Sequence, residues 1–422
     1  MINTSKIKGM WKIKELRNKI LFTLFIFVIF RLGAHVPVPG IDISQLQELF
    51  RGHDLFGFID MIGGRALSNF TIFAMGVTPY INASIIIQLL KVIIPKIETL
   101  FEEGEEGKKV INKYIRCGTV VLAFLQATGM TLGLIRPAIL NPSFISYSTI
   151  IVALTAGTVF LMWLGEQISE NGIGNGISLI IFAGIIASLP EGAMLLMERI
   201  MIGEANLLAL SFIGLFLLCL IMFVIALTQG ERRIPIQYSK KIVGKKTYGG
   251  QSKYIPIKVN QAGVIPVIFA SSILMFPPTM AQFIDHPITT NIANALDWGS
   301  PLNTILYFSL IIFFTYFYTA IQFNPAQIAD NIKKYGGFVP GLRPGNPTAE
   351  YFEKVVSRMT LLGALSLATI CTLPILLENT VDFNLIFSGT ALIIVVGVSI
   401  ETTKQIESHL LIRHYSGFIK NR

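Results

Sequence analysis

Long apolar stretches, separated by short polar segments, dominate the pattern of this chain. Ten of them carry few charges and approach the ~20 residues that a helix needs to cross a bilayer. They cover residues 20–36, 70–90, 117–135, 148–165, 172–189, 207–230, 259–283, 303–323, 359–377 and 383–400. The pattern predicts an all-α polytopic membrane protein with ten transmembrane helices.

One further apolar piece, residues 55–67, is too short to span a bilayer. Gly63 and Gly64 interrupt it, it carries Asp60 and Arg65, and it lies just before the span at 70–90. Lipid cannot satisfy the backbone polar groups of such a piece, so it must lie within protein or against a water-filled cavity. The order of these segments is the first indication of a pore with a short segment inside it.

Composition agrees with a membrane protein, since 52% of the 422 residues are hydrophobic and 14% are charged. A soluble globular chain carries about 25% charged residues. The three cysteines stand far apart in apolar runs, which favours buried, unreactive thiols over metal ligands or disulfides. Residues 1–19 are basic and lack a small-residue cleavage site, so we expect a retained first span after them.

The positive charges give an orientation. Placing residues 1–19 in the cytoplasm leaves only Arg51, Arg65, Arg136 and Arg199 in the outer loops, out of 34 Lys and Arg residues. This asymmetry obeys the positive-inside rule. We therefore expect both termini, including the tail 401–422, on the cytoplasmic side of the cytoplasmic (inner) membrane.

Charged residues are nearly absent within the spans themselves. Arg31 is the exception, near one end of the first span, where its side chain can reach the interface. Ion-coupled transporters usually carry ionisable groups at membrane depth. The sequence also has no catalytic constellation or metal-ligand cluster, so we expect a protein that is not an enzyme and uses no cofactor.

The glycines of NGIGNGIS, residues 171–178, favour close helix packing over a nucleotide loop.

Two cytoplasmic loops are unusual. Residues 231–258 hold eight Lys and Arg residues, among them Lys240, Lys245 and Lys246, and the alternation around Tyr248 predicts a projecting hairpin. Such a loop either attracts anionic lipid and fixes topology, or docks an acidic or RNA-rich partner. Residues 324–358 contain GGFVPGLRPG with Arg343 at its turn, which is either a partner contact or an ordinary solvated charge.

Several long motifs resemble the SecY family, the channel subunits of bacterial protein translocases. They include FAMGVTPYINASIIIQLL at 73–90, EEGEEGKK at 102–109, FLMWLGEQISENGIGNGISLIIFAGI at 160–185, KVNQAGVIPVIFASSI at 258–273, FNPAQIADNIKK at 323–334 and GGFVPGLRPG at 336–345. The resemblance implies two inverted five-helix halves, 20–189 and 205–400, joined by a hinge loop at 190–204.

The resemblance also assigns site residues. It implies an hourglass pore closed by an apolar ring of Val77, Ile81, Ile177, Ile181, Ile265, Ile268 and Ile394. The spacings within the first three pairs put both side chains on one helix face, although without the resemblance a lipid-facing position or core packing would be the simpler interpretation. It implies a plug at 55–67 with Leu55, Phe58, Ile59, Ile62, Gly63 and Gly64, where Arg65 departs from the small residue usual in the family.

By the same resemblance Asn82, Gln88, Asn260 and Phe276 line a lateral gate to lipid, with interhelical packing as the alternative. The implied partners are the small subunits SecE and SecG, the ATPase SecA, the ribosome, preprotein substrates and membrane lipid. Lys240, Lys245, Lys246 and Arg343 are the expected docking contacts. The function implied is a conduit that moves unfolded preproteins across the membrane and hydrophobic segments into it.

Two other functions remain alternatives from the residues alone. A small-solute secondary transporter shares the number of spans, but the lack of intramembrane ionisable residues disfavours it. A protein that binds nucleic acid or a lipid surface would suit the net charge of +9, but that charge is confined to the cytoplasmic loops.

Overall fold

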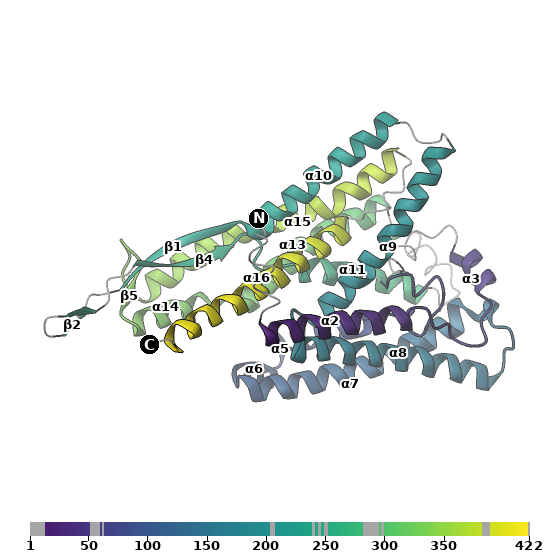
Figure 1. Cartoon of the computed structure of the whole chain (residues 1–422), viewed down its shortest axis with the longest axis horizontal. Helices are drawn as coiled ribbons and strands as arrows, with labels where there is room; N and C mark the ends of the chain where they lie inside the picture. The colour runs from purple at the N-terminus through teal and green to yellow at the C-terminus, as the bar shows by residue number, and fades with distance from the viewer. Residues whose placement is uncertain are drawn as a thin grey trace. The chain divides into compact units, whose positions relative to one another are not determined.

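The computed structural model describes residues 13–50, 60, 63–202, 207–238, 241–243, 246–248, 252–281, 295–296, 299–381 and 389–420, which are mostly helical (Figure 1). The chain divides into two compact units. The first unit comprises Met1–Leu207, Ser272–Asn303 and Asn384–Arg422, and the second comprises Leu208–Ser271 and Thr304–Phe383.

The first unit is a helical bundle. Its helices are α2 (Lys14–Gly33), α3 (Ile43–Phe50), α5 (Thr78–Ile93), α6 (Pro95–Glu102), α7 (Glu105–Gly129), α8 (Phe144–Asn171), α9 (Gly176–Met201) and α16 (Gly389–Lys420), with a π-helical turn at Met130–Leu134 and a 3-10 turn at Arg136–Ala138. α7 packs against α5, α6 and α8, while α8 also contacts α2 and α9. α16 packs against α9, so the last helix of the chain belongs to this unit.

Small residues let the helices of the first unit approach closely. Ala123 and Ala127, one turn apart on α7, are fully buried in an apolar cluster with Phe70 and with Leu154 of α8. Without a hydrophobic driving force in lipid, such close packing is what holds membrane helices together.

The second unit combines helices with a small sheet. It holds most of α10 (Leu207–Gln229), the first part of α11 (Ile265–Ala281), most of α13 (Pro301–Gln322), α14 (Pro325–Lys334) and α15 (Asn346–Val381). Its strands are β1 (Glu231–Tyr238), β2 (Lys241–Val243), β3 (Lys246–Tyr248), β4 (Ser252–Lys258) and β5 (Gly337–Phe338). β1 lies between β4 and β5 in an antiparallel sheet, and β2 pairs with β3 further along the same hairpin (Figure 1).

The predicted hairpin is present, but its turn lies elsewhere. We expected the chain to reverse around Tyr248. The register pairs Glu231 with Lys258 and Lys241 with Tyr248, so Tyr248 lies within a paired strand and not at the turn. The glycine pair after Tyr248 suggested the turn, yet pairing along the whole hairpin decides its position.

Among the described residues, five helices are long and apolar enough to cross a membrane. They cover Glu105–Gly133, Phe144–Asn171, Pro301–Lys334, Asn346–Leu377 and Gly389–Leu410. Apolar side chains on their surfaces are well exposed, for example Val121 at 58%, Leu125 at 60% and Val152 at 62%. Exposed apolar faces of this kind mark a surface that meets lipid or protein. These helices support a multi-pass membrane protein.

Three predicted boundaries are wrong. The span expected at 70–90 becomes helical only at Thr78, because Gly76 adopts a φ of +56° and Pro79 favours the first turn of a helix. α8 does not end at Gly165 but continues to Asn171. α9 runs through Pro190 to Met201, across most of the segment we expected to be a hinge loop.

Candidate functional site

Val77 and Ile81 lie at the start of α5, although the sequence predicted an earlier start for this span. Val77 is the N-cap residue, and the Ile81 amide donates to its carbonyl oxygen at 3.1 Å. The two side chains therefore lie one turn apart at the start of the helix. Val77 is buried and Ile81 is half-buried.

Ile177 and Ile181 occupy the corresponding place at the start of α9, whose first residue is Gly176. Side chains of two other helices fix the preceding loop. The Ile173 amide donates to Thr23 Oγ1 of α2 at 3.2 Å, and the Gly176 amide donates to Ser169 Oγ of α8 at 2.9 Å. The second bond satisfies an amide that a helix start leaves without an intrahelical partner, and the first satisfies an amide of the loop.

The glycines of this loop serve close packing, which confirms the interpretation made from the sequence. A Cβ on Gly176 would lie 1.7 Å from the Gly165 carbonyl oxygen, so no side chain fits between α8 and α9. Ile177 Cδ1 lies 2.4 Å from the position of a Cβ on Gly165. Gly165 therefore provides the surface against which Ile177 rests.

The remaining ring candidates lie in both units. Ile394 of α16 belongs to the first unit and is 1% exposed. Ile265 and Ile268 are half-buried in the first turn of α11, which belongs to the second unit. Five of the seven ring candidates thus share one compact unit, and the convergence of all seven on one axis stays a prediction.

The plug assignment falls mostly outside the described residues, which exclude Leu55, Phe58, Ile59 and Ile62. Gly63 is half-buried and Gly64 is buried. Arg31 of α2 donates from Nη1 to the Gly64 carbonyl oxygen at 3.1 Å. Gly64 has a φ of +67°, and a Cβ there would lie 3.0 Å from Gly184 Cα of α9. The end of the predicted plug is therefore held between α2 and α9.

Asp60 closes the turn around these glycines. Its Oδ1 accepts from the Leu67 and Ser68 amides, each at 2.9 Å, and its carbonyl oxygen accepts from the Arg65 amide at 2.8 Å. Arg65 itself has a φ of +65°, which is uncommon for a residue with a side chain. The sequence drew attention to both charges but did not predict that Asp60 organises the turn.

The four gate candidates are divided between the two units, and their common role stays a prediction. Asn82 and Gln88 are half-buried on α5, where Gln88 Nε2 donates to Ser84 Oγ at 3.2 Å. Asn260 lies in the second unit beside Gly363 of α15, and its buried Oδ1 has no hydrogen-bond partner within the described part of the chain. Phe276 lies on α11, and its side chain is outside the described residues.

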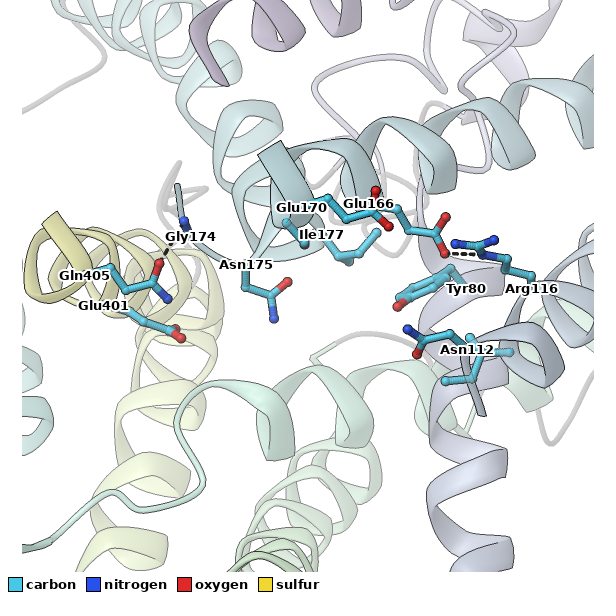
Figure 2. A pocket seen from close by; sticks show the side chains of 12 residues that line it. Tyr80, Asn112, Arg116, Glu166, Glu170, Gly174, Asn175, Ile177, Glu401 and Gln405 are labelled. Carbon is cyan, nitrogen blue, oxygen red and sulfur yellow. Dashed lines mark hydrogen bonds and ion pairs between the residues drawn. The ribbon is translucent and has the colours of Figure 1, made fainter. Parts of the chain in front are cut away.

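A polar pocket that we did not predict lies at the start of α9 (Figure 2). Its volume is about 440 Å³, and it is bounded by side chains of α5, α7, α8 and α16 as well as by Ile177. Across it, Arg116 Nε of α7 donates to Glu166 Oε1 of α8 at 2.7 Å. Tyr80, the neighbour of Ile81, lies beside this pair (Figure 2). The available signal was two opposite charges, Arg116 and Glu166, directly beside the adjacent predicted spans 117–135 and 148–165.

The two unusual loops form one structure. β5 of the second loop pairs with β1 of the first, through Gln237 with Phe338 and Tyr238 with Gly337. Ile234, Ile236 and Ile257 bury the base of this sheet against α14 and α15. Sequence reasoning treated the loops separately, because pairing between distant strands leaves no local signal.

Two of the four charged docking candidates lie within the described residues. Lys240 and Lys245 are outside the described residues, whereas Lys246 is in β3. Arg343 is exposed, and Thr348 Oγ1 donates to its carbonyl oxygen at 2.8 Å, which fixes the turn. At the sheet base Arg233 Nε donates to Glu231 Oε1 at 2.7 Å, and this bond raises the pKa of the Arg233 guanidinium.

Comparison with known proteins covers almost the whole chain. The SecY family profile matches residues 71–403. The chain is 45% identical to protein translocase subunit SecY of Halalkalibacterium halodurans, covering 98% of this chain and 99% of that protein. It is 43% identical to the subunit of Thermus thermophilus (98% of each chain) and 44% identical to that of Escherichia coli K12 (96% and 94%).

Solved structures of channels share the fold. A protein-conducting channel matches with a TM-score of 0.67 at 18% identity, covering 93% of this chain and 92% of that one. Sec61 from the canine ribosome-channel complex matches with a TM-score of 0.63 at 17% identity and the same coverage. The identities along the full length show the relationship that the motifs indicated. This chain belongs to the SecY family.

Proposed function

We propose that this chain is the central, channel-forming subunit of a protein translocase, through which unfolded preproteins cross the cytoplasmic membrane and hydrophobic segments enter it. The observation that carries the proposal is the 43–45% identity to translocase subunits over nearly their whole length. The chain itself carries out no chemical step, so the energy for transport must come from a partner.

The proposed architecture has ten spans in two inverted halves, 20–189 and 205–400, with both termini in the cytoplasm. The plug at 55–67 fills the outer side of the pore. Two observations support this arrangement. Five of the described helices are long and apolar enough to cross a membrane, and the segment around Gly64 is not helical but is tied to α2 and α9.

The ring at the pore waist seals by its apolar character. Water confined between aliphatic side chains lacks hydrogen-bond partners, so the gap empties and ions cannot pass. A passing chain displaces only weak apolar contacts, and the ring therefore needs no specific recognition of sequence. Val77 and Ile81 at the start of α5, with Ile177 and Ile181 at the start of α9, support this role because each pair places two aliphatic side chains one turn apart.

Lateral exit and docking complete the proposal. Hydrophobic segments leave toward lipid past Asn82, Gln88, Asn260 and Phe276, because they partition favourably into the bilayer. SecA or the ribosome docks on the two cytoplasmic loops, at Lys240, Lys245, Lys246 and Arg343, and SecE and SecG are the small partner subunits. The buried base of the sheet supports docking, since a rigid base holds the charges in place.

A crosslinking experiment tests the passage of a polypeptide through the ring. Cys117, Cys219 and Cys371 are first replaced by Ala, and one new cysteine is introduced at Ile81. A secreted precursor with a single cysteine is stalled by a tightly folded domain at its end, and disulfide formation is then measured in membranes. We expect a crosslink at Ile81→Cys and none at the matched variant Val152→Cys, because Val152 lies 62% exposed on the outer face of α8. Equal crosslinking at both positions, or none at Ile81, contradicts the proposal.

A further inference from the structure

Gln405 of α16 holds the loop that precedes α9. The Gly174 amide donates to Gln405 Oε1 at 2.9 Å, a contact between residues 231 positions apart (Figure 2). Thr402 Oγ1, one turn earlier on α16, lies 3.4 Å from the position of a Cβ on Gly174. Gln405 is half-buried, so its amide lies against the loop and not in open solvent.

The conformation of the loop makes this hydrogen bond important. Gly174 has a φ of +95°, so its amide does not continue the helical ladder of α8. A partly buried amide without a partner costs free energy, and a side chain from another helix supplies the partner here. Thr23 and Ser169 do the same for Ile173 and Gly176. Side chains of three helices, α2, α8 and α16, therefore fix the backbone before and at the start of α9.

The ring residues lie close to this contact on both helices. Ile177 and Ile181 follow Gly174 by three and seven residues, within the first two turns of α9. On α16, Ile394 precedes Gln405 by eleven residues, which is close to three full turns and ~16 Å. Ile394 and Gln405 therefore share one face of a continuous helix, and that helix contacts α9.

We propose that Gln405 is a positioning residue of the pore ring. Its hydrogen bond to Gly174 fixes the start of α9 against α16, so that Ile177 and Ile181 stand in register with Ile394 in the closed channel. The inference rests on the proposed function, because it assumes that these isoleucines seal the pore. The contrasting possibility is that Gln405 contributes only to general stability.

The experiment measures resting ion conductance of the full-length protein in planar bilayers, with thermal stability measured alongside. Gln405→Leu removes the acceptor of the hydrogen bond from Gly174. Gln405→Asn keeps a polar amide but is too short to reach Gly174, so it tests the same loss if Gln405→Leu folds poorly. Gln405→Glu keeps an acceptor oxygen at the same reach. Thr403→Val is the matched control, since Thr403 is exposed on α16 and donates only to Ser399 of its own helix.

We expect about fivefold higher resting conductance for Gln405→Leu and Gln405→Asn, the ratio that corresponds to ~1 kcal/mol for one hydrogen bond. Gln405→Glu and Thr403→Val should conduct like the unchanged protein. Unchanged conductance in both loss variants, or an equal rise in Gln405→Glu, overturns the inference.

Ile181→Asn separates this inference from the proposed function. If Ile181→Asn leaks and the loss variants of Gln405 do not, the ring stands and Gln405 does not position it. If Ile181→Asn does not leak, the ring itself is wrong, and the role of Gln405 falls with it.

Discussion

Gly165 and Gly176 bring the backbones of α8 and α9 into direct contact, since a Cβ on Gly176 would lie 1.7 Å from the Gly165 carbonyl oxygen. Ile177 follows Gly176 directly and rests on Gly165. The position of a ring candidate thus depends on the absence of two side chains. A change that separates α8 from α9 would therefore also displace a side chain of the proposed seal.

Replacing Gly176 by alanine should destabilise the protein, because the added methyl group cannot fit without separating α8 from α9. We expect a loss of ~1–3 kcal/mol, typical of overpacking, and a lower melting temperature in detergent. Gly214→Ala is the matched control, because Gly214 lies in α10 with no atom within 4 Å of its Cβ position. A Gly176 variant as stable as the Gly214 variant contradicts the packing argument.

The pair Arg116–Glu166 joins α7 and α8 beside the pocket, with side chains 49% and 17% exposed. Partial exposure limits what such a pair contributes, so we expect a coupling of only ~0.5–1 kcal/mol. A double-mutant cycle with Arg116→Ala and Glu166→Ala, followed by thermal unfolding, measures it. The same cycle on Lys108 and Glu105, which are 65% and 85% exposed, should give a coupling near zero. Equal couplings would remove the reason to single out the first pair.

The parts of the fold that could be predicted from the sequence are the helices with long, uniform apolar runs. The apolar runs predicted the presence of α2, α7, α8, α13 and α16, although not all of their ends, because membrane spans are long and uniform. Boundaries failed where local backbone geometry decided them. Gly76 and Pro79 delay the start of α5, and no hydropathy pattern records that.

Contacts between distant residues were the part of the site that could not be predicted. Arg31 lies near one end of the first predicted span and Glu166 directly follows the fourth, but their partners, the Gly64 carbonyl oxygen and Arg116, lie 33 and 50 positions away. The joining of β5 to β1 likewise depends on tertiary packing. A lone charge within a span is a functional signal by itself, and applying that rule to Arg31 would have indicated a tie of this kind.

Arg31 should help to hold the plug, because its guanidinium donates to the Gly64 carbonyl oxygen at 3.1 Å. Arg31→Met removes this donor and keeps an unbranched side chain. We expect higher resting ion conductance in planar bilayers, smaller than the rise produced by deleting residues 55–67. Leu32→Met is the control, since Leu32 is 67% exposed on the same helix. If Arg31→Met and Leu32→Met conduct alike, Arg31 does not hold the plug.

Arg343 should matter for transport more than for folding. It is exposed at a turn that Thr348 fixes through the backbone, so its side chain is not needed for the local structure. We expect Arg343→Glu to lower SecA-driven translocation into vesicles at least tenfold, with an unchanged melting temperature. Lys334→Glu, an exposed charge in the last turn of α14, should have a smaller effect. Normal translocation by the Arg343 variant would argue against a docking role.

The apolar ring makes the most direct physical prediction. Asparagine at Ile81 and Ile181 offers hydrogen-bond partners to water at the waist, so the gap should wet and conduct ions. We expect resting conductance to rise in Ile81→Asn and Ile181→Asn, and to rise further in the double variant. Ile181→Leu keeps the aliphatic character and volume of a side chain that is 3% exposed, so it should conduct like the unchanged protein. A leak in Ile181→Leu as large as in Ile181→Asn would mean that packing defects, and not wetting, open the pore, and the sealing mechanism would then be wrong.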